Sequence, residues 1–513
     1  MTVRSAATRQ TSGWLVGAAV LGTLAAVALV AVNAPVAVAA AVVACALCIG
    51  NVFARRLPYW FLGALWALLL VYAVLGKGGA NIGVGGIYVG ELVLAVGLLA
   101  ATVGGAWRTL PYRSPLAWGL VAFGVWGALR TAPYVGAYGI DALRDAVVWG
   151  YGVYAILVAG ALSRTGWTRR VVERYGAWLL WFPVWIPVMW ALVRYVREAL
   201  PTAPGSDVPL VVFKAGDAAF HLMGVAAFVL LGLHRDAGGA RRRLAPGGWV
   251  WWTAWFVAFA LTGAASRAAI LAILLGGAAV LALRPATRLW RPALTTLALS
   301  AVFFASGIRV EVREGRFLSG SEMVANLASV GGARAPGNRD ATREWRLRWW
   351  RTIVDYTVHG PYFWTGKGYG INLAEADGFV VGNRDRRPLR SPHNGHLTIL
   401  ARSGVPGAVL WLLLQGGFAL SLLRAYRRSV RAGTDWWARV NLWILACWTT
   451  FIVNAAFEVS LEGPHGGIWF WSVFGFGIAA LELQRREAAW RRQHVGEAGP
   501  LRPAPDVHAR AAG

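Results

Sequence analysis

The sequence predicts an all-α protein that crosses a membrane many times. Three observations lead to this fold class: 57% of the 513 residues are hydrophobic, only 14% are charged, and long apolar runs recur along the chain. A soluble domain has roughly 25% charged residues. A bilayer offers no water to unpaired backbone groups, so apolar runs of about 20 residues are expected to be helices.

We expect about fourteen membrane-spanning helices. A short polar N-terminus, residues 1–13, precedes an apolar run that is long enough to span. A second run follows at once after Asn33-Ala34-Pro35, so the first is not interpreted as a cleavable signal. The expected spans lie near 14–32, 35–53, 57–75, 87–103, 115–129, 146–162, 176–193, 218–233, 249–265, 268–283, 293–307, 404–423, 440–457 and 467–483.

These spans divide the chain into five parts. Residues 14–307 hold the first eleven helices, residues 308–403 form one long loop, and residues 404–483 hold the last three helices. The basic tail, 484–513, is expected to be disordered. The net charge is +26, and clusters such as Arg55-Arg56 and Arg241-Arg242-Arg243 fall in one set of short loops. The positive-inside rule then places both termini in the cytoplasm and the protein in the inner or plasma membrane.

The long loop, 308–403, faces outward in this topology and is nevertheless basic. Two interpretations remain open, a solvated charged surface or a site for an anionic ligand. A helix is expected from Asp340 to His359, with Arg346 and Trp350 on one face. Its tryptophans suit the headgroup zone, so a plain anchor helix is an alternative. The glycines of Gly366-Lys367-Gly368 do not fit a phosphate-binding loop and predict a turn.

Other candidate residues lie at the same outer level. Arg267 stands between two spans, where it could snorkel or bind a phosphate through its planar guanidinium. His393 and Asn394 precede the span that starts near Gly404. A histidine there could accept a proton from an attacking hydroxyl, or be an ordinary surface residue. Arg144 could pair with Asp145 or contribute to the same anion site.

Taken together, these segments resemble the signature of the O-antigen ligase/polymerase superfamily. The pieces are His393-Asn394-Gly395-His396-Leu397 with Gly404 and Gly407, Ser266-Arg267 at the start of a span, and Arg346, Trp350, Pro361, Gly366 and Gly368 in the long loop. The resemblance covers about residues 250–425. Three departures concern the acceptor: His396 replaces a usual aromatic, Arg402 replaces a frequent Glu, and the stretch from Pro361 to Gly366 is two residues longer than expected.

The resemblance implies a membrane glycosyltransferase with a GT-C-like helical fold. Its donor would be a glycan on a polyprenyl (undecaprenyl) pyrophosphate, and its acceptor a hydroxyl of a glycan or lipid at the outer face of the bilayer. No cofactor, metal, nucleotide sugar or nucleic acid is implied. Arg267, Arg346 and Arg144 would bind the pyrophosphate, and His393 and Asn394 would be catalytic. The residues expected to position the acceptor or the loop are His396, Trp350, Gly366 and Gly368.

Two other functions compete with this interpretation. A lipid-linked glycan transporter without bond-forming activity would also have many spans and a basic outer surface, although such proteins commonly show an internal repeat and a charged path at mid-membrane. A non-catalytic scaffold for polysaccharide export is the third possibility. Within the superfamily, the sequence does not separate a ligase from a polymerase.

Overall fold

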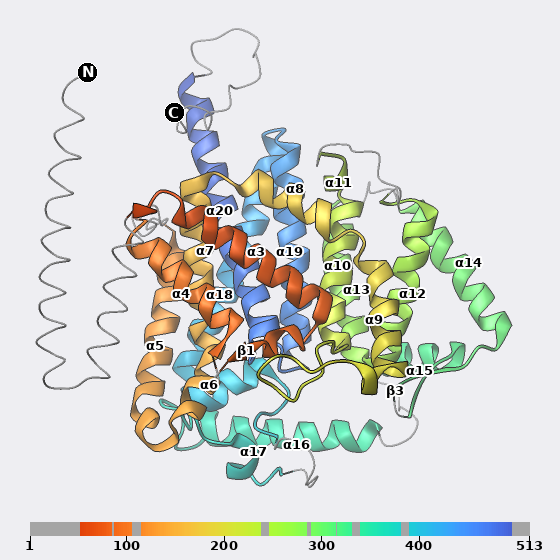
Figure 1. Cartoon of the computed structure of the whole chain (residues 1–513), viewed down its shortest axis with the longest axis horizontal. Coiled ribbons are helices and arrows are strands. Elements are labelled where there is room, and N and C mark those ends of the chain that lie inside the picture. The colour runs from red at the N-terminus through yellow and green to blue at the C-terminus, as the bar shows by residue number, and fades with distance from the viewer. Residues whose placement is uncertain are drawn as a thin grey trace, which may run out of the picture.

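A computed structural model describes residues 52–84, 87–104, 114–236, 246–284, 289–313, 315–330, 339–380 and 389–494. The expected spans 14–32 and 35–53 lie outside the described residues, apart from the last two positions of the second. Figure 1 shows a bundle of helices with a small layer of elements, including α16 and α17, across one end.

The first half of the chain is helical with one small hairpin. Its helices are α3 (Leu57–Leu75), α4 (Val89–Thr102), α5 (Pro115–Tyr138), α6 (Ile140–Gly150), α7 (Gly152–Thr165), α8 (Thr168–Trp178), α9 (Phe182–Tyr195), α10 (Ala215–Leu230) and α11 (Leu233–Asp236), with short 3-10 turns η1 (Gly79–Asn81) and η3 (Arg197–Ala199). The antiparallel strands β1 (Gly83–Val84) and β2 (Ile87–Tyr88) form the hairpin.

The second half adds α12 (Trp249–Ala265), α13 (Arg267–Leu283) and α14 (Trp290–Ser306). The expected outer loop folds into an antiparallel hairpin, β3 (Val310–Arg313) and β4 (Arg316–Leu318), followed by α15 (Gly320–Val330), α16 (Arg339–Val358) and α17 (Leu373–Ala376). The chain then forms α18 (Gly395–Arg431), α19 (Asp435–Ala455) and α20 (Pro464–His494). Residues 484–494 of the expected tail therefore extend α20, and 495–513 lie outside the described part.

Within the described residues, three helices are individually long and apolar enough to cross a membrane: α3, α18 and α20. Two bent pairs, α6 with α7 and α8 with α9, each qualify as one span, which raises the number to five. The apolar helices α4, α10, α12 and α13 have only 14 to 17 residues. A membrane protein of mostly helical structure is confirmed, whereas the expected number of fourteen spans is not.

Two expected spans are interrupted by bends. The span 146–162 is divided between α6 and α7, which meet at 45°, and the span 176–193 between α8 and α9, which meet at 53°. Pro183 explains the second bend: it lacks an N–H and therefore occupies the first turn of α9 rather than the interior of a longer helix. Hydropathy thus predicts which segments are apolar but gives little information about where a helix bends.

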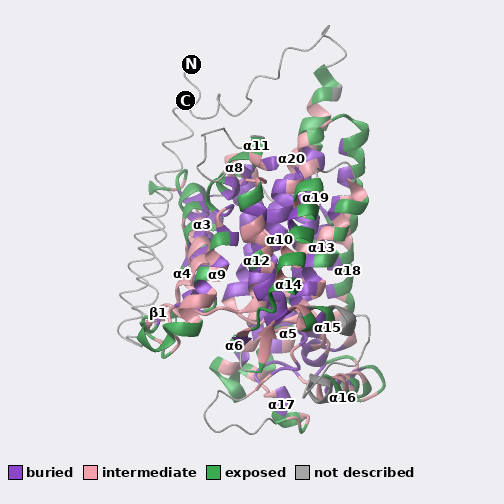
Figure 2. Cartoon of the chain, turned by 90° about the vertical axis from the view of Figure 1, so that its right-hand side faces the viewer, coloured by how far each residue is buried: buried purple, intermediate pink, exposed green. Residues whose placement is uncertain are grey.

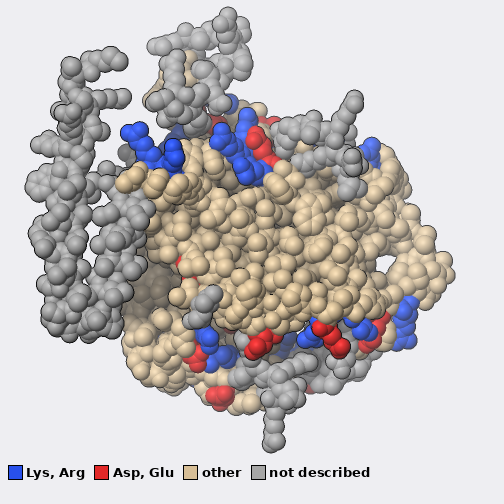
Figure 3. Space-filling view, in the orientation of Figure 1, with Lys and Arg blue, Asp and Glu red and all other residues tan. Residues whose placement is uncertain are grey.

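Charged side chains gather at two opposite ends of the bundle. On the face drawn in Figure 3 a broad, almost uncharged belt lies between them, with mostly Lys and Arg at the end of α8 and a mixture of both signs at the end of α16. Such a belt is what a bilayer requires, because a charged side chain in hydrocarbon costs several kcal/mol. The folded outer segment thus lies beyond the belt, at the opposite end from α8.

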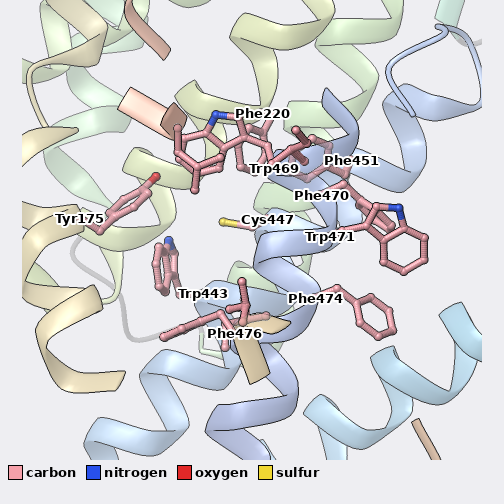
Figure 4. Packing of buried hydrophobic residues seen from close by; sticks show 14 of the residues in the cluster. Tyr175, Phe220, Trp443, Cys447, Phe451, Trp469, Phe470, Trp471, Phe474 and Phe476 are labelled. Carbon is pink, nitrogen blue, oxygen red and sulfur yellow. The ribbon is translucent and has the colours of Figure 1, made fainter. Parts of the chain in front are cut away.

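The core of the bundle is aromatic and runs through its centre, as the buried residues in Figure 2 show. Figure 4 shows aromatic side chains of α8, α10, α19 and α20 packed around the buried thiol of Cys447. Lipid tails are as apolar as leucine, so helix association in a bilayer depends on close packing and on polar contacts. Tryptophan provides both: indole N–H groups donate to backbone carbonyls of neighbouring helices, Trp185 to Val74, Trp251 to Leu180, Trp255 to Leu222 and Trp443 to Gly224.

A second, small core lies under α16. Trp349 and Ile353 pack there against α17 and the first turns of α18, and neither side chain is exposed. The Trp349 indole donates to Asp377 Oδ2 at 2.6 Å, and Lys367 forms an ion pair with the same carboxylate. Trp349 is therefore not at the membrane surface, and α16 is a packed helix rather than a simple anchor.

Candidate active site

A cavity of about 1880 Å³ lies between the helical bundle and α16. It brings together four of the residues selected from the sequence: Arg267, Arg346, Trp350 and His393. Nine cationic side chains and three acidic ones line it; these are Lys77, Arg194, Arg197, Lys214, Arg267, Arg309, Arg316, Arg343 and Arg346, against Glu198, Glu322 and Glu458. We call this space the cationic cavity. Its composition suits an anionic ligand.

Arg346 projects from α16 into this cavity. Its Nη1 donates to the carbonyl of Phe457 at 3.2 Å, while its Nε is buried and has no hydrogen-bond partner. Burial lowers the pKa of Arg346, and the like charge of Arg267 lowers it further, against the opposing effect of Glu458. Two arginines that repel each other across a cavity would both be stabilised by an anion between them.

Arg267 is the first residue of α13, a position that ordinarily disfavours a cation. The N-terminus of a helix carries partial positive charge and unpaired N–H groups. Ser266 caps this end, with its Oγ accepting from the Ala269 N–H at 3.3 Å. An arginine added to a helix N-terminus makes a strong anion-binding position, because the guanidinium and the helix dipole act on the same ligand.

His393 is held in an unusual backbone conformation beside Arg346. Its φ is 53°, and it is the one non-glycine residue of the described chain with a positive φ. Its Nδ1 is buried without a hydrogen-bond partner. Burial and then the charge of Arg346 lower the pKa of His393 to about 4. The imidazole is therefore neutral at physiological pH.

The neighbours of His393 fix its position. The Trp350 indole donates to the Pro392 carbonyl at 2.9 Å, so this tryptophan positions the loop. Asn394 caps α18: its Oδ1 accepts from the N–H groups of His396 and Leu397, both at 3.1 Å. Because the Asn394 side-chain oxygen is engaged in this cap, the geometry gives it a structural role next to the histidine.

His396 does not line the cavity. Trp411 Nε1 donates to its Nδ1 at 3.0 Å, which leaves the proton on Nε2 to be donated to the carbonyl of Ile452, also at 3.0 Å. The side chain thus joins α18 to α19. It was expected to position the acceptor or the loop, and its contacts are those of a residue that joins two helices.

Lys214 and Glu458 line the cavity but were not among the site residues selected from the sequence. They form an ion pair of 3.3 Å that is mostly buried. Burial alone would lower the pKa of Lys214, but the carboxylates of Asp217 and Glu458 outweigh it and the pKa is raised. Lys214, like Arg267, stands just before an apolar run on the expected outer side. This placement is the only feature of the sequence that could have identified Lys214 as a site residue.

Gly366 and Gly368 support a break in α18 beside the cavity. Gly404, at φ 67° and ψ −173°, interrupts the helix. The freed carbonyls of Ala401 and Arg402 accept from the N–H groups of Lys367, at 2.7 Å, and Gly368, at 3.1 Å. Gly366 has a φ of +59°, and a Cβ added there would lie 2.4 Å from the Arg402 carbonyl carbon. These glycines therefore form a turn, as expected, and one that only glycine fits.

The buried side chain of Arg402 also stabilises this turn, because its Nη1 donates to the carbonyls of Gly368 and Ile371. Its side chain is 2% exposed and contacts Asp145 at 2.9 Å, and Arg390 reaches the same carboxylate at 3.1 Å. We call residues 362–371, Asp145, Arg390 and Arg402 the brace. Arg144, expected at the pyrophosphate, lies outside the cavity lining; its exposed side chain pairs with Asp141 at 3.5 Å.

Comparison with known proteins identifies a family for one part of the chain. Residues 252–412 match the family model described as O-antigen ligase. The matched segment begins in α12, ends in α18 and contains Arg267, Arg346 and His393. No curated protein matches the chain.

Proposed function

We propose that this chain transfers a glycan from a polyprenyl pyrophosphate to an acceptor hydroxyl. The premise is the match to the O-antigen ligase model, which supports an O-antigen ligase-like membrane protein of surface polysaccharide biosynthesis. The reaction would take place in the cationic cavity, at the outer face of the inner or plasma membrane, with both termini in the cytoplasm. The observation that supports this most strongly is the convergence of Arg267, Arg346 and His393 on one cavity from three separate segments.

The proposed chemistry assigns each group one task. The bond from the anomeric carbon to the pyrophosphate oxygen breaks, and negative charge grows on the leaving pyrophosphate. Arg267 and Arg346 would stabilise that charge, because fixed cations in a partly dehydrated cavity act more strongly than in water. The acceptor hydroxyl would attack the opposite face of the anomeric carbon, which predicts inversion.

His393 lines the cavity and would orient the acceptor hydroxyl and take its proton on a ring nitrogen. Its pKa is about 4, which makes it a weak base. The charge of Arg346 contributes to that low value. An anionic donor placed beside Arg346 would offset this field and raise the pKa of His393 toward the pH at which it works best as a base. Donor binding would thereby activate the base.

Replacement of His393 by Asn tests the proposal. Asparagine tolerates a positive φ, so this variant removes the imidazole and keeps the backbone conformation. We expect glycan transfer in nanodiscs, measured by mass spectrometry with a lipid-linked donor purified from host membranes, to fall by about 100-fold or more. His359, whose side chain is 71% exposed near the end of α16, provides the control His359→Asn, which should keep wild-type activity.

Wild-type transfer in a correctly inserted His393→Asn variant would remove this residue from the mechanism. Movement of the lipid-linked glycan across the bilayer without any new glycosidic bond would instead support a transporter. Gene deletion followed by gel profiling of surface glycans separates the two enzymes: loss of chain length with single units retained indicates a polymerase, and accumulation of lipid-linked chains indicates a ligase.

A further inference from the structure

Eight of the nine cationic side chains of the cavity fall into two groups by exposure; the ninth, the partly buried Arg316, donates to the Ala265 carbonyl. Lys214, Arg267 and Arg346 are partly buried and lie with His393; we call these residues the floor. Five others are exposed and form what we call the rim: Lys77, Arg194, Arg197, Arg309 and Arg343. The proposed reaction uses the floor residues and leaves the rim residues without an assigned role.

The floor and the rim are built by different elements. Arg194 and Arg197 lie at the end of α9 and in η3, while Arg309 precedes β3. Two contacts hold these elements together: the Trp190 indole donates to the Val312 carbonyl at 3.1 Å, and Arg194 pairs with Glu311 at 3.1 Å. The rim arginines are therefore carried on an ordered part of the protein surface, with the hairpin fixed to α9.

The charge of the cavity exceeds the requirement of a pyrophosphate. Its lining has six more cationic than acidic side chains. A pyrophosphate esterified at both ends carries about two negative charges, one for each phosphate. When Glu311 is counted against Arg194 and the two charges of the pyrophosphate are subtracted, three of the six excess cations remain without an anionic counterpart. Like charges gathered around one cavity repel one another, so this excess lowers stability unless a ligand offsets it.

The volume of the cavity is also larger than one small ligand requires. Typical ligand pockets measure about 300–1,000 Å³, and this cavity measures about 1880 Å³. A glycan whose anomeric carbon reacts at the floor can extend along the cavity toward the exposed rim residues.

We propose that the sugar chain bound along the rim is anionic, with carboxylate or phosphate groups on its residues. This inference rests on the proposed function and specifies its substrate class. Arginine suits such a ligand because its planar guanidinium pairs with both oxygens of a carboxylate or phosphate. The anionic chain belongs to the donor, the acceptor or both, and the three cases share this chemistry.

Two probes separate the rim from the floor in the full-length protein held in nanodiscs of neutral lipid. Tetragalacturonate is the anionic probe, with its carboxyl-reduced neutral form for comparison, and farnesyl pyrophosphate is the floor probe. We expect the tetragalacturonate Kd to be at least tenfold lower than that of the neutral form. Arg197→Gln and Arg309→Gln should each weaken tetragalacturonate binding about threefold, as befits exposed charges. Neither should change farnesyl pyrophosphate binding.

Arg351→Gln is the matched control. Arg351 is an exposed arginine of α16 that does not line the cavity, and its replacement should leave both affinities unchanged. Arg346→Gln should weaken farnesyl pyrophosphate binding and leave most of the tetragalacturonate affinity intact. Raising the salt concentration should weaken tetragalacturonate binding more in the wild type than in the Arg197→Gln Arg309→Gln double variant.

Three results would overturn the inference. The first is equal affinity for the charged and neutral tetrasaccharides. The second is tetragalacturonate binding that depends on Arg346 alone, which would mean a single anion site at the floor. The third is binding of phosphatidylglycerol, but not tetragalacturonate, through Arg197 and Arg309, which would assign the rim to lipid headgroups. Each can occur while the His393 variant still loses transfer, so the inference and the proposed function can fail separately.

Discussion

The cationic cavity and the brace lie next to each other, and both contain arginines close to the sequence motifs. In the brace, Arg390 and Arg402 share the carboxylate of Asp145. In the cavity, the hydrogen bond of Arg346 goes to a neutral backbone carbonyl, and its Nε has no partner. The difference separates structural arginines from ligand-binding ones. A buried arginine that is paired with a carboxylate stabilises the fold. An arginine that lines a cavity and has an unsatisfied donor is available to bind a ligand.

The largest expected effect tests the brace. Asp145→Ala leaves Arg402 as a buried charge without its counterion, which should cost about 3–5 kcal/mol of stability. Thermal unfolding in detergent measures it. Asp141→Ala removes an acid that is 40% exposed and should change stability by about 1 kcal/mol or less. Equal melting temperatures for the Asp145→Ala and Asp141→Ala variants would contradict a stabilising role for the buried pair of Arg402 and Asp145.

The second effect tests the turn that supports the break in α18. Gly366→Ala combines a strained positive φ with an added Cβ 2.4 Å from the Arg402 backbone, so we expect a loss of about 3 kcal/mol. Gly378→Ala is the matched control, because its φ is +77° and no atom lies within 4 Å of the added Cβ. That variant should lose about 1 kcal/mol, from the backbone alone. If both glycines tolerate alanine equally, the close contact at Gly366 is unimportant.

The third effect tests the cavity. Arg346→Gln should melt like the wild type but lower kcat/KM for the lipid-linked donor by about 100-fold. It should also move the pH profile. Protonated His393 cannot accept a proton, so wild-type kcat/KM should fall as the pH drops through about 4, the pKa of His393 in the free protein. Removal of the nearby positive charge should raise that pKa and shift the acid limb to higher pH. An unshifted limb would exclude His393 as the group that titrates.

The smallest effect concerns the position of Arg267. Ser266→Ala removes the side-chain cap of α13 and should cost about 1 kcal/mol, with donor affinity reduced only a few-fold. Ser266→Asp should restore the cap, because aspartate also accepts at this position. If Ser266→Ala instead lowers donor affinity as strongly as Arg346→Gln, the serine contacts the donor directly.

The sequence predicted those parts of the site that are determined by residue type and membrane side. Arg267 and His393 were selected as polar groups at the outer ends of apolar runs, and Arg346 as a residue of the helix expected in the long loop. The structure brings all three to one cavity. Helix α16 was expected from Asp340 to His359 and is observed from Arg339 to Val358. Caps and breakers in the local sequence were sufficient for that assignment.

Features that depend on tertiary contacts could not be predicted in this way. The pairing of Lys214 with Glu458 joins residues that are distant in sequence. Arg144 and Arg267 look alike along the chain, yet only Arg267 faces the cavity. A hydropathy pattern contains no direction, so it did not show the bends between α6 and α7 or between α8 and α9, although Pro183 marks the second of them. Residue type predicted which groups matter, and packing decides which of them meet.

The order in which the cavity lining appears along the chain has a consequence for biosynthesis. The lining begins at Lys77 and ends at Glu458, within the turn before α20. During translation, the cations of the early segments emerge long before Glu458, the partner of Lys214. The site is thus completed only when the last helices leave the ribosome and insert. A chain that terminates before this turn would contain the cavity arginines and His393 but would lack Glu458 and α20. Its cavity would have more uncompensated positive charge than that of the full chain. Quality control could therefore eliminate such a chain by recognising the incomplete helical bundle.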